Sequence, residues 1–199
     1  MAALLVLSVL AGCASSLSAQ VTRYQQWPGD TVGAMYRIDA SDAQKGNLQF
    51  SAYSDMVRAA IGATGMVEAR GSAPPRFDIS LEYGNPVSQV WVQRNPDPFY
   101  GGGYYGFNRR PFGWGYSPWY GWPYGPVPEQ VQIDVFKNYL TVVIRDRTQD
   151  HREVYRATAR NTSRGDNLTA VMPYLARAVF DHFPGRNGQV VDVKYDLPR

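Results

Sequence analysis

The residue types that carry most enzyme chemistry are sparse in this chain and do not form a catalytic pattern. The sequence has one cysteine, Cys13, and two histidines, His151 and His182. A zinc site needs several Cys, His or carboxylate ligands at a suitable spacing, and no segment provides them. Motifs of a serine-nucleophile elbow, a zinc-dependent protease or a phosphate-binding loop are absent as well. The sequence therefore predicts a protein that is not an enzyme and has no cofactor or metal site.

The remaining titratable side chains have simpler structural interpretations. His151 lies in a polar loop, where we expect a solvated imidazole. His182 is expected late in a helix, where an imidazolium would interact favourably with the carbonyl groups of the helix C-terminus. The carboxylates of Asp134, Asp146 and Asp150 fall at the ends of predicted strands. We expect acids at such positions to be solvated.

Cys13 is the one residue in this set for which the sequence predicts a chemical role, because the residues before it resemble a modification signal. The apolar run over residues 2–10 is too short to cross a bilayer, which takes about 20 residues, but it suits the apolar region of a signal peptide. The run ends in Leu10-Ala11-Gly12-Cys13, which resembles the lipobox of bacterial lipoproteins. The resemblance implies that residues 1–12 are removed as a signal peptide. It also implies that Cys13 is lipidated, carrying a diacylglyceryl group and an acyl chain such as palmitate.

A lipidated Cys13 predicts where the protein resides. Several acyl chains on one residue give stable attachment, whereas a single chain binds a membrane only reversibly. In the lipoproteins that the motif resembles, Asp after the cysteine favours the inner membrane, so Ala14 implies the periplasmic side of the outer membrane. Residues 13–20 are small and polar and predict a flexible tether. The net charge of +3 contains no block of like charges and gives no support for nucleic-acid binding.

Residues 21–199 predict a single α+β domain with two helices. Asn47 is a candidate N-cap for the first helix, and Gly62 ends it. Its apolar positions recur at helical spacing at Leu48, Ala52, Met56 and Ala60, beside Tyr53, Val57 and Ile61. The second helix is expected to begin near Thr169, which would leave Pro173 in the first turn. Its apolar positions are Leu168, Val171, Leu175, Val179 and Phe183.

Alternating apolar and polar residues predict a largely antiparallel or mixed sheet of about 6–8 strands, covered by the two helices. The predicted strands cover residues 21–27, 31–38, 66–69, 76–83, 87–93, 131–135, 140–144, 153–160 and 191–195. Residues 76–83 and 87–93 are expected to pair as a hairpin. Lys137-Asn138 is expected to form a tight turn between two further strands. The last strand must return beside a strand that is distant in sequence.

These patterns together resemble a known family. The strand Phe77-Asp78-Ile79-Ser80-Leu81, the passage from residues 140–146 into 153–160, and a second helix closing in Phe183-Pro184 are similar to bacterial lipoproteins catalogued as domain of unknown function 4136. Many members carry Trp where this chain has Tyr155. The resemblance implies an envelope location and a mixed α/β domain, and it implies no established activity.

A low-complexity insert over residues 97–128 interrupts the domain. Within it, residues 99–125 contain 12 aromatic residues, 8 glycines and 3 prolines. Glycine and proline at this density are incompatible with a regular helix or a central strand. Residues 101–106 formally match G-x-G-x-x-G, but no helix can begin after them, so dinucleotide binding is excluded.

Three interpretations of the insert stay open. It is a flexible loop without a specific task, a surface for interaction, or a sugar site, for which it offers few polar groups. Tyr and Trp suit an interaction surface because a flat apolar ring carries a polar tip. The candidate interaction residues are Tyr104, Tyr105, Arg109, Arg110, Trp114, Trp119 and Trp122. The partner would be an envelope protein, a second copy or the lipid headgroups.

The sequence therefore favours a lipid-anchored envelope protein with a non-enzymatic binding or scaffolding role. The alternative is a small-ligand carrier that holds a lipid in an apolar pocket between the sheet and the helices. The carrier requires an apolar cavity of roughly 300 Å³ or more.

Overall fold

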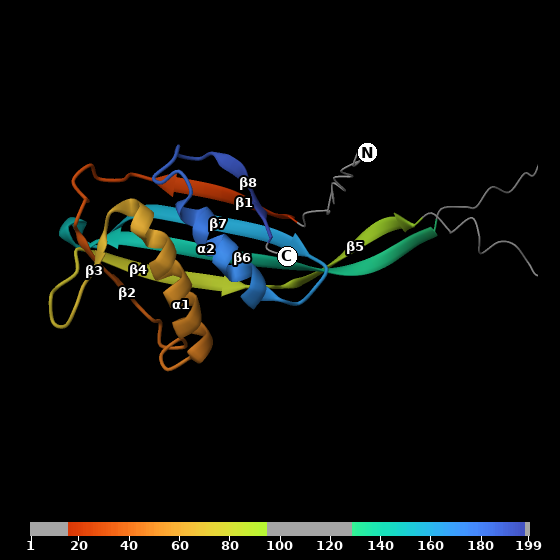
Figure 1. Cartoon of the computed structure of the whole chain (residues 1–199), viewed down its shortest axis with the longest axis horizontal. Coiled ribbons are helices and arrows are strands. Elements are labelled where there is room, and N and C mark those ends of the chain that lie inside the picture. Colours follow the sequence, from red (N-terminus) through yellow and green to blue (C-terminus); the bar gives the residue numbers. More distant parts are fainter. Residues whose placement is uncertain (1–15, 95–128, 198–199) are drawn as a thin grey trace, which may run out of the picture. The chain divides into compact units, whose positions relative to one another are not determined.

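The computed structural model describes residues 16–94 and 129–197, and it has the α+β fold that the sequence predicts (Figure 1). A mixed sheet of eight strands is combined with two α-helices. The elements in chain order are β1 (Ser16–Gln25), β2 (Met35–Ile38), α1 (Leu48–Ile61), the 3₁₀ helix η1 (Gly62–Thr64), β3 (Val67–Glu68), β4 (Phe77–Gly84), β5 (Val87–Arg94), β6 (Glu129–Asp146), the 3₁₀ helix η2 (Arg147–Gln149), β7 (Arg152–Ser163), α2 (Leu168–Phe180) and β8 (Val190–Asp196).

The chain divides into two compact units. The first comprises the chain up to Val87 and from Phe136 onwards, and the second comprises Ser88–Val135. The first unit holds both helices and the strand order β3-β2-β4-β6-β7-β1-β8. In the second unit, β5 pairs with the first part of β6. There the side chain of Gln89 donates a hydrogen bond to Asp134 and accepts one from Gln132.

In the first unit, the two helices lie across one face of the sheet (Figure 1). Phe77, Ile79 and Leu81 of β4 point to this face and are buried, as their alternation with polar residues predicts. Strand β6, which pairs with β4, contributes Leu140, Val142 and Ile144, and all three are fully buried. The helices add a buried layer of Tyr53, Val57, Ile61, Met172, Leu175 and Val179. The core therefore lies between the sheet and the helices.

Both helices form close to where the sequence predicts them. Asn47 caps α1, because its side-chain oxygen accepts from the backbone N–H groups of Gln49 and Phe50. Leu48 is 86% exposed, so its assignment to the core face is wrong. Asn167 caps α2, which therefore begins one residue earlier than expected and places Pro173 beyond the first turn.

Three expectations about the strands are corrected. β1 begins at Ser16, so residues 16–20 belong to the sheet and not to a tether. β5 pairs with β6 and not with β4, which itself pairs with the later part of β6. Lys137-Asn138 is not a turn, because β6 is one continuous strand of 18 residues. Among the described residues, no helix is long and apolar enough to span a membrane.

The side chain of Asn138 explains why β6 continues. Asn138 is fully buried and pairs in the ladder with Asn161 of β7. Its Nδ2 donates to Oδ1 of Asn161 at 3.3 Å and to Oγ of Ser163 at 3.0 Å. These bonds satisfy the buried Nδ2 group within the sheet, whereas Oδ1 of Asn138 has no hydrogen-bond partner among the described residues. The sequence favours a turn at Lys137-Asn138 because Asn tolerates the positive φ of tight hairpins, but both residues lie within the strand.

Candidate functional site

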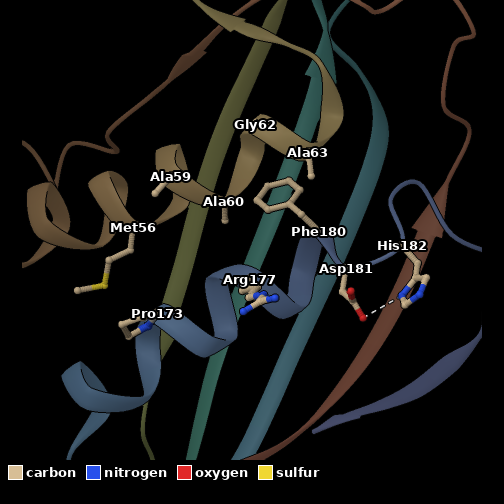
Figure 2. A pocket seen from close by; sticks show the side chains of 10 residues that line it. All are labelled: Met56, Ala59, Ala60, Gly62, Ala63, Pro173, Arg177, Phe180, Asp181 and His182. Atoms are coloured by element: carbon tan, nitrogen blue, oxygen red, sulfur yellow. Dashed lines mark ion pairs between the residues drawn. The ribbon is translucent and has the colours of Figure 1, made fainter. Parts of the chain in front are cut away.

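The main concave feature among the described residues is an open groove between α1 and α2 (Figure 2). It has a volume of about 610 Å³. The α1 side, together with the start of η1, contributes Met56, Ala59, Ala60, Gly62 and Ala63. The α2 side, together with the residues after it, contributes Pro173, Arg177, Phe180, Asp181 and His182. Most of this lining is apolar.

Helical spacing and small side chains create the groove. Met56 and Ala60 are four residues apart and so lie along one side of α1, and Ala63 of η1 continues the row of small side chains begun by Ala59 and Ala60. Alanine places only a methyl group there, which leaves space between helices that larger side chains would fill. On α2, Phe180 is only 2% exposed, so its ring is anchored in the core while lining the groove. The core thus gives the groove a rigid apolar wall.

The polar side chains of the groove, Arg177, Asp181 and His182, come from the C-terminal part of α2 and the two residues after it. Oδ2 of Asp181 lies 2.9 Å from Nδ1 of His182, and this pair sits beyond the end of α2 (Figure 2). The guanidinium of Arg177 lies 5.4 Å from the ring centroid of Tyr195, a cation–π contact. Within the described part of the chain, Arg177 has no carboxylate within 4 Å. The groove therefore presents one guanidinium that stacks on Tyr195 and has no acidic partner among the described residues.

Buried polar side chains fix the end of α2 that carries this guanidinium. Nη2 of Arg23 donates to the carbonyl oxygen of Ala178 at 2.9 Å, where the helix dipole favours a cation. The hydroxyl of Tyr155 donates to the carbonyl oxygen of Val179. Burial raises the pKa of Tyr155 to about 12, so this hydroxyl stays protonated at neutral pH. The Ala178 carbonyl also accepts from the backbone N–H of Asp181 at 3.2 Å, so the side chains of Arg23 and Tyr155 add to the pairing of the last carbonyls of α2.

Sequence reasoning missed the role of Arg23, although a signal for it is present. Leu17, Ala19, Val21 and Arg23 alternate along β1 and all four are buried. Arg23 therefore continues an inward-facing row of a strand. A cation at such a position requires an acceptor in the core, and the C-terminal end of α2 provides it.

The titratable residues singled out in the sequence lie apart from a common site. His151 is exposed, and its Nδ1 lies 3.0 Å from Oδ2 of Asp78. His182 is not in the helix, because α2 ends at Phe180 and His182 adopts a left-handed conformation with φ of 51°. Asp146 is fully buried, which corrects the expectation of a solvated carboxylate. No cluster of metal-ligating side chains occurs in residues 16–94 and 129–197.

The predicted lipidation site and interaction surface fall outside the described residues. Cys13 precedes the first described residue, Ser16. The aromatic and arginine residues of the insert, Tyr104, Tyr105, Arg109, Arg110, Trp114, Trp119 and Trp122, lie between Arg94 and Glu129. The lipidation site and the interaction surface therefore stay predictions, and the groove is a site that sequence reasoning did not identify.

Comparisons with known proteins give one family match and distant similarities of fold. A family model described as a domain of unknown function (DUF4136) matches residues 20–185. No curated protein matches the chain.

Two solved structures illustrate the similarities of fold. A PDZ domain protein from Parabacteroides distasonis is 10% identical with a TM-score of 0.46, and the alignment covers 91% of this chain and 39% of that one. The chain thus spans about two fifths of the length of that protein. A PelC dodecamer from Paraburkholderia phytofirmans is 13% identical with a TM-score of 0.44, covering 85% of this chain and 99% of that one.

Proposed function

The chain belongs to the DUF4136 family of domains of unknown function, and from this premise we propose that it is a lipid-anchored envelope protein that binds a single-chain amphiphile in the α1–α2 groove. The anchor is Cys13, and the location is the periplasmic side of the outer membrane. The role is binding and not catalysis. The observation that carries this proposal is the groove itself, with its apolar lining and its one unpaired guanidinium.

The size and chemistry of the groove support this ligand class. Binding sites for small molecules occupy about 300–1,000 Å³ and combine an apolar lining with a few polar groups. A volume of about 610 Å³ lies within this range. The groove is open along the helices, so an acyl chain can lie against Met56, Ala60 and Pro173 without entering the core. This arrangement differs from the carrier expected from the sequence, whose pocket would lie between the sheet and the helices.

Charge complementarity selects an anionic headgroup. Oδ2 of Asp181 lies against Nδ1 of His182, whereas Arg177 has no acidic partner among the described residues. A guanidinium forms two parallel hydrogen bonds with a carboxylate or a phosphate. A fatty acid or a lysophospholipid carries such a group next to one apolar chain. A fatty acid and a lysophospholipid therefore both match the apolar lining and the guanidinium of the groove.

A fluorescent fatty acid tests the groove directly. Dansyl-aminoundecanoic acid is titrated into the protein, and its emission should rise to saturation on binding. Ala59→Trp places a large ring in the groove, and we expect it to weaken binding at least about tenfold. Ala52→Trp is the matched control, because Ala52 is an exposed residue of the same helix that does not line the groove. Equal binding by both variants would rule out the groove.

The headgroup is tested with a second pair of probes. Arg177→Gln should weaken binding of the fatty acid about tenfold and leave binding of the corresponding primary amide almost unchanged. An equal loss for both probes would show that Arg177 does not recognise the charge. Competition by oleic acid and by lysophospholipid then distinguishes the two sources of the anionic headgroup.

A further inference from the structure

β8 forms an edge of the sheet. It pairs with β1 along its whole length, from Val190 opposite Thr22 to Asp196 opposite Ser16, without a shift in register. On its other side, no described strand pairs with it. An unprotected edge presents unpaired N–H and C=O groups to any further strand, and natural proteins shorten, bend or block such edges. β8 has seven residues, contains no proline and has no bulge in its ladder with β1.

The sequence of β8 is complementary to itself. In an antiparallel pair of two β8 strands centred on Val193, each Asp192 lies opposite Lys194 of the other copy. Each Val191 likewise lies opposite Tyr195. A twofold axis repeats both pairs, so four favourable pairs arise from one strand sequence. Opposite charges and aromatic–β-branched pairs are the cross-strand pairs that stabilise sheets.

Neighbouring registers are unfavourable. With Lys194 at the centre, two Lys194 side chains face each other, and each Asp192 faces Asp196. With Asp192 at the centre, two Asp192 side chains face each other. Like charges directly opposite destabilise a pair of strands. The charge pattern therefore selects the register centred on Val193, in which all seven residues of β8 pair.

The two faces of β8 suit this pairing. Asp192 and Lys194 are exposed, and the side chain of Asp192 accepts a long hydrogen bond of 3.4 Å from Nε2 of Gln20. Val193 and Tyr195 are half-buried and pack against the core. The ring of Tyr195 lies 5.7 Å from that of Tyr174 on α2. A β8 strand from a second copy would continue the sheet on both faces, placing apolar side chains beside Val193 and Tyr195 and charged side chains beside Asp192 and Lys194.

We propose that two copies of this chain associate edge to edge through β8, antiparallel and centred on Val193, forming one sheet that is continuous across a closed dimer. β8 contributes no residue to the lining of the α1–α2 groove. A membrane anchor would assist the association, because it confines both copies to one plane and raises their effective concentration.

Charge exchange tests the proposal. The full chain is extracted in a nonionic detergent, and its association is measured by sedimentation over a range of concentrations. We expect the wild type to form dimers. Asp192→Lys or Lys194→Asp alone places like charges opposite each other twice and should raise the dissociation constant at least about tenfold. The double variant D192K/K194D restores both pairs and should return the dissociation constant to within about threefold of the wild type.

Each other outcome contradicts the proposal. A wild type that stays monomeric at all concentrations rules it out. A dimer that is insensitive to either single exchange uses another surface, such as the insert. Failure of the double variant to restore association, while its circular dichroism matches the wild type, shows that Asp192 and Lys194 do not face each other. Because these residues are exposed, the variants should keep the fold.

Discussion

Nη2 of Arg76 donates a hydrogen bond to Oδ2 of Asp146 at 3.1 Å and so joins the segment before β4 to the end of β6. The Asp146 side chain is completely buried, whereas that of Arg76 is 22% exposed. Arg76 also donates to the backbone oxygen of Asp30 at 2.9 Å. The second carboxylate oxygen of Asp146 accepts from the backbone N–H of Thr148 at 2.9 Å. The Arg76–Asp146 pair therefore connects three segments of the first unit.

Replacing this carboxylate should destabilise the fold. Asp146→Asn keeps the shape but turns an N–H group toward Arg76 or Thr148, so at least one buried bond to a charged group is lost. We expect the free energy of unfolding to fall by about 2 kcal/mol, measured by urea denaturation. Asp30→Asn is the control, because Asp30 is exposed, and the midpoint should stay nearly unchanged. Equal effects of the two substitutions would contradict a special role for Asp146.

The same carboxylate predicts how stability depends on pH. Burial by itself would raise the pKa of Asp146, but hydrogen bonds from Thr148, Arg76 and Gln149 outweigh burial and hold the pKa below its ordinary value of 3.8. The stabilisation is therefore complete above that value and is lost as the pH falls through the pKa of the folded state. Unfolding free energies between pH 7 and pH 2 should fall more steeply for the wild type than for D146N. Parallel curves would show that Asp146 does not titrate differently in the folded state.

The continuity of β6 can be tested at Asn138. Glycine would favour the tight turn that the sequence suggests, but within a strand it weakens the sheet and here also removes the bonds to Asn161 and Ser163. We expect Asn138→Gly to lower the free energy of unfolding by about 1–2 kcal/mol. Asn138→Thr replaces the amide by a hydroxyl that can still donate one hydrogen bond, and its β-branched side chain favours a strand, so it should cost less. A stabilising effect of glycine would favour the turn.

The anchor predicts a change in fractionation. Cys13→Ser removes the thiol that lipidation requires, so the protein should move from the membrane fraction to the soluble fraction of lysed cells. Ser15→Ala changes a neighbouring residue without touching the thiol and should stay with the membrane. If C13S remains membrane-bound, attachment through Cys13 is wrong.

Deleting part of the insert should affect partner binding without affecting the stability of the first unit. The core of the first unit is assembled from segments on both sides of residues 99–125, so deleting them should shift the thermal midpoint by no more than about 4 °C, measured by calorimetry. Crosslinking in intact cells should then lose any partner that the insert binds. Loss of folding would instead make the segment part of the core, and an unchanged set of partners would favour a loop without a specific task.

The sequence determined the local elements and the class of fold. Asn47 locates the start of α1, because its side chain satisfies backbone N–H groups within three residues. The alternation around Phe77 identifies the buried side of β4, because side chains in a strand point to opposite faces in turn. The family resemblance likewise rests on local patterns, and the family model confirms it.

Only the tertiary structure decided which strands pair, which polar groups are buried and where a groove opens. Asp146 and Arg76 are 70 residues apart, so no local pattern relates them. Asn138 carries the composition of a turn, yet its buried bonds to β7 hold it in a strand. The α1–α2 groove exists because two helices that are distant in sequence meet through small side chains on one side and Arg177 on the other. Such contacts form only when segments that are distant in sequence pack together, so local sequence patterns do not predict them.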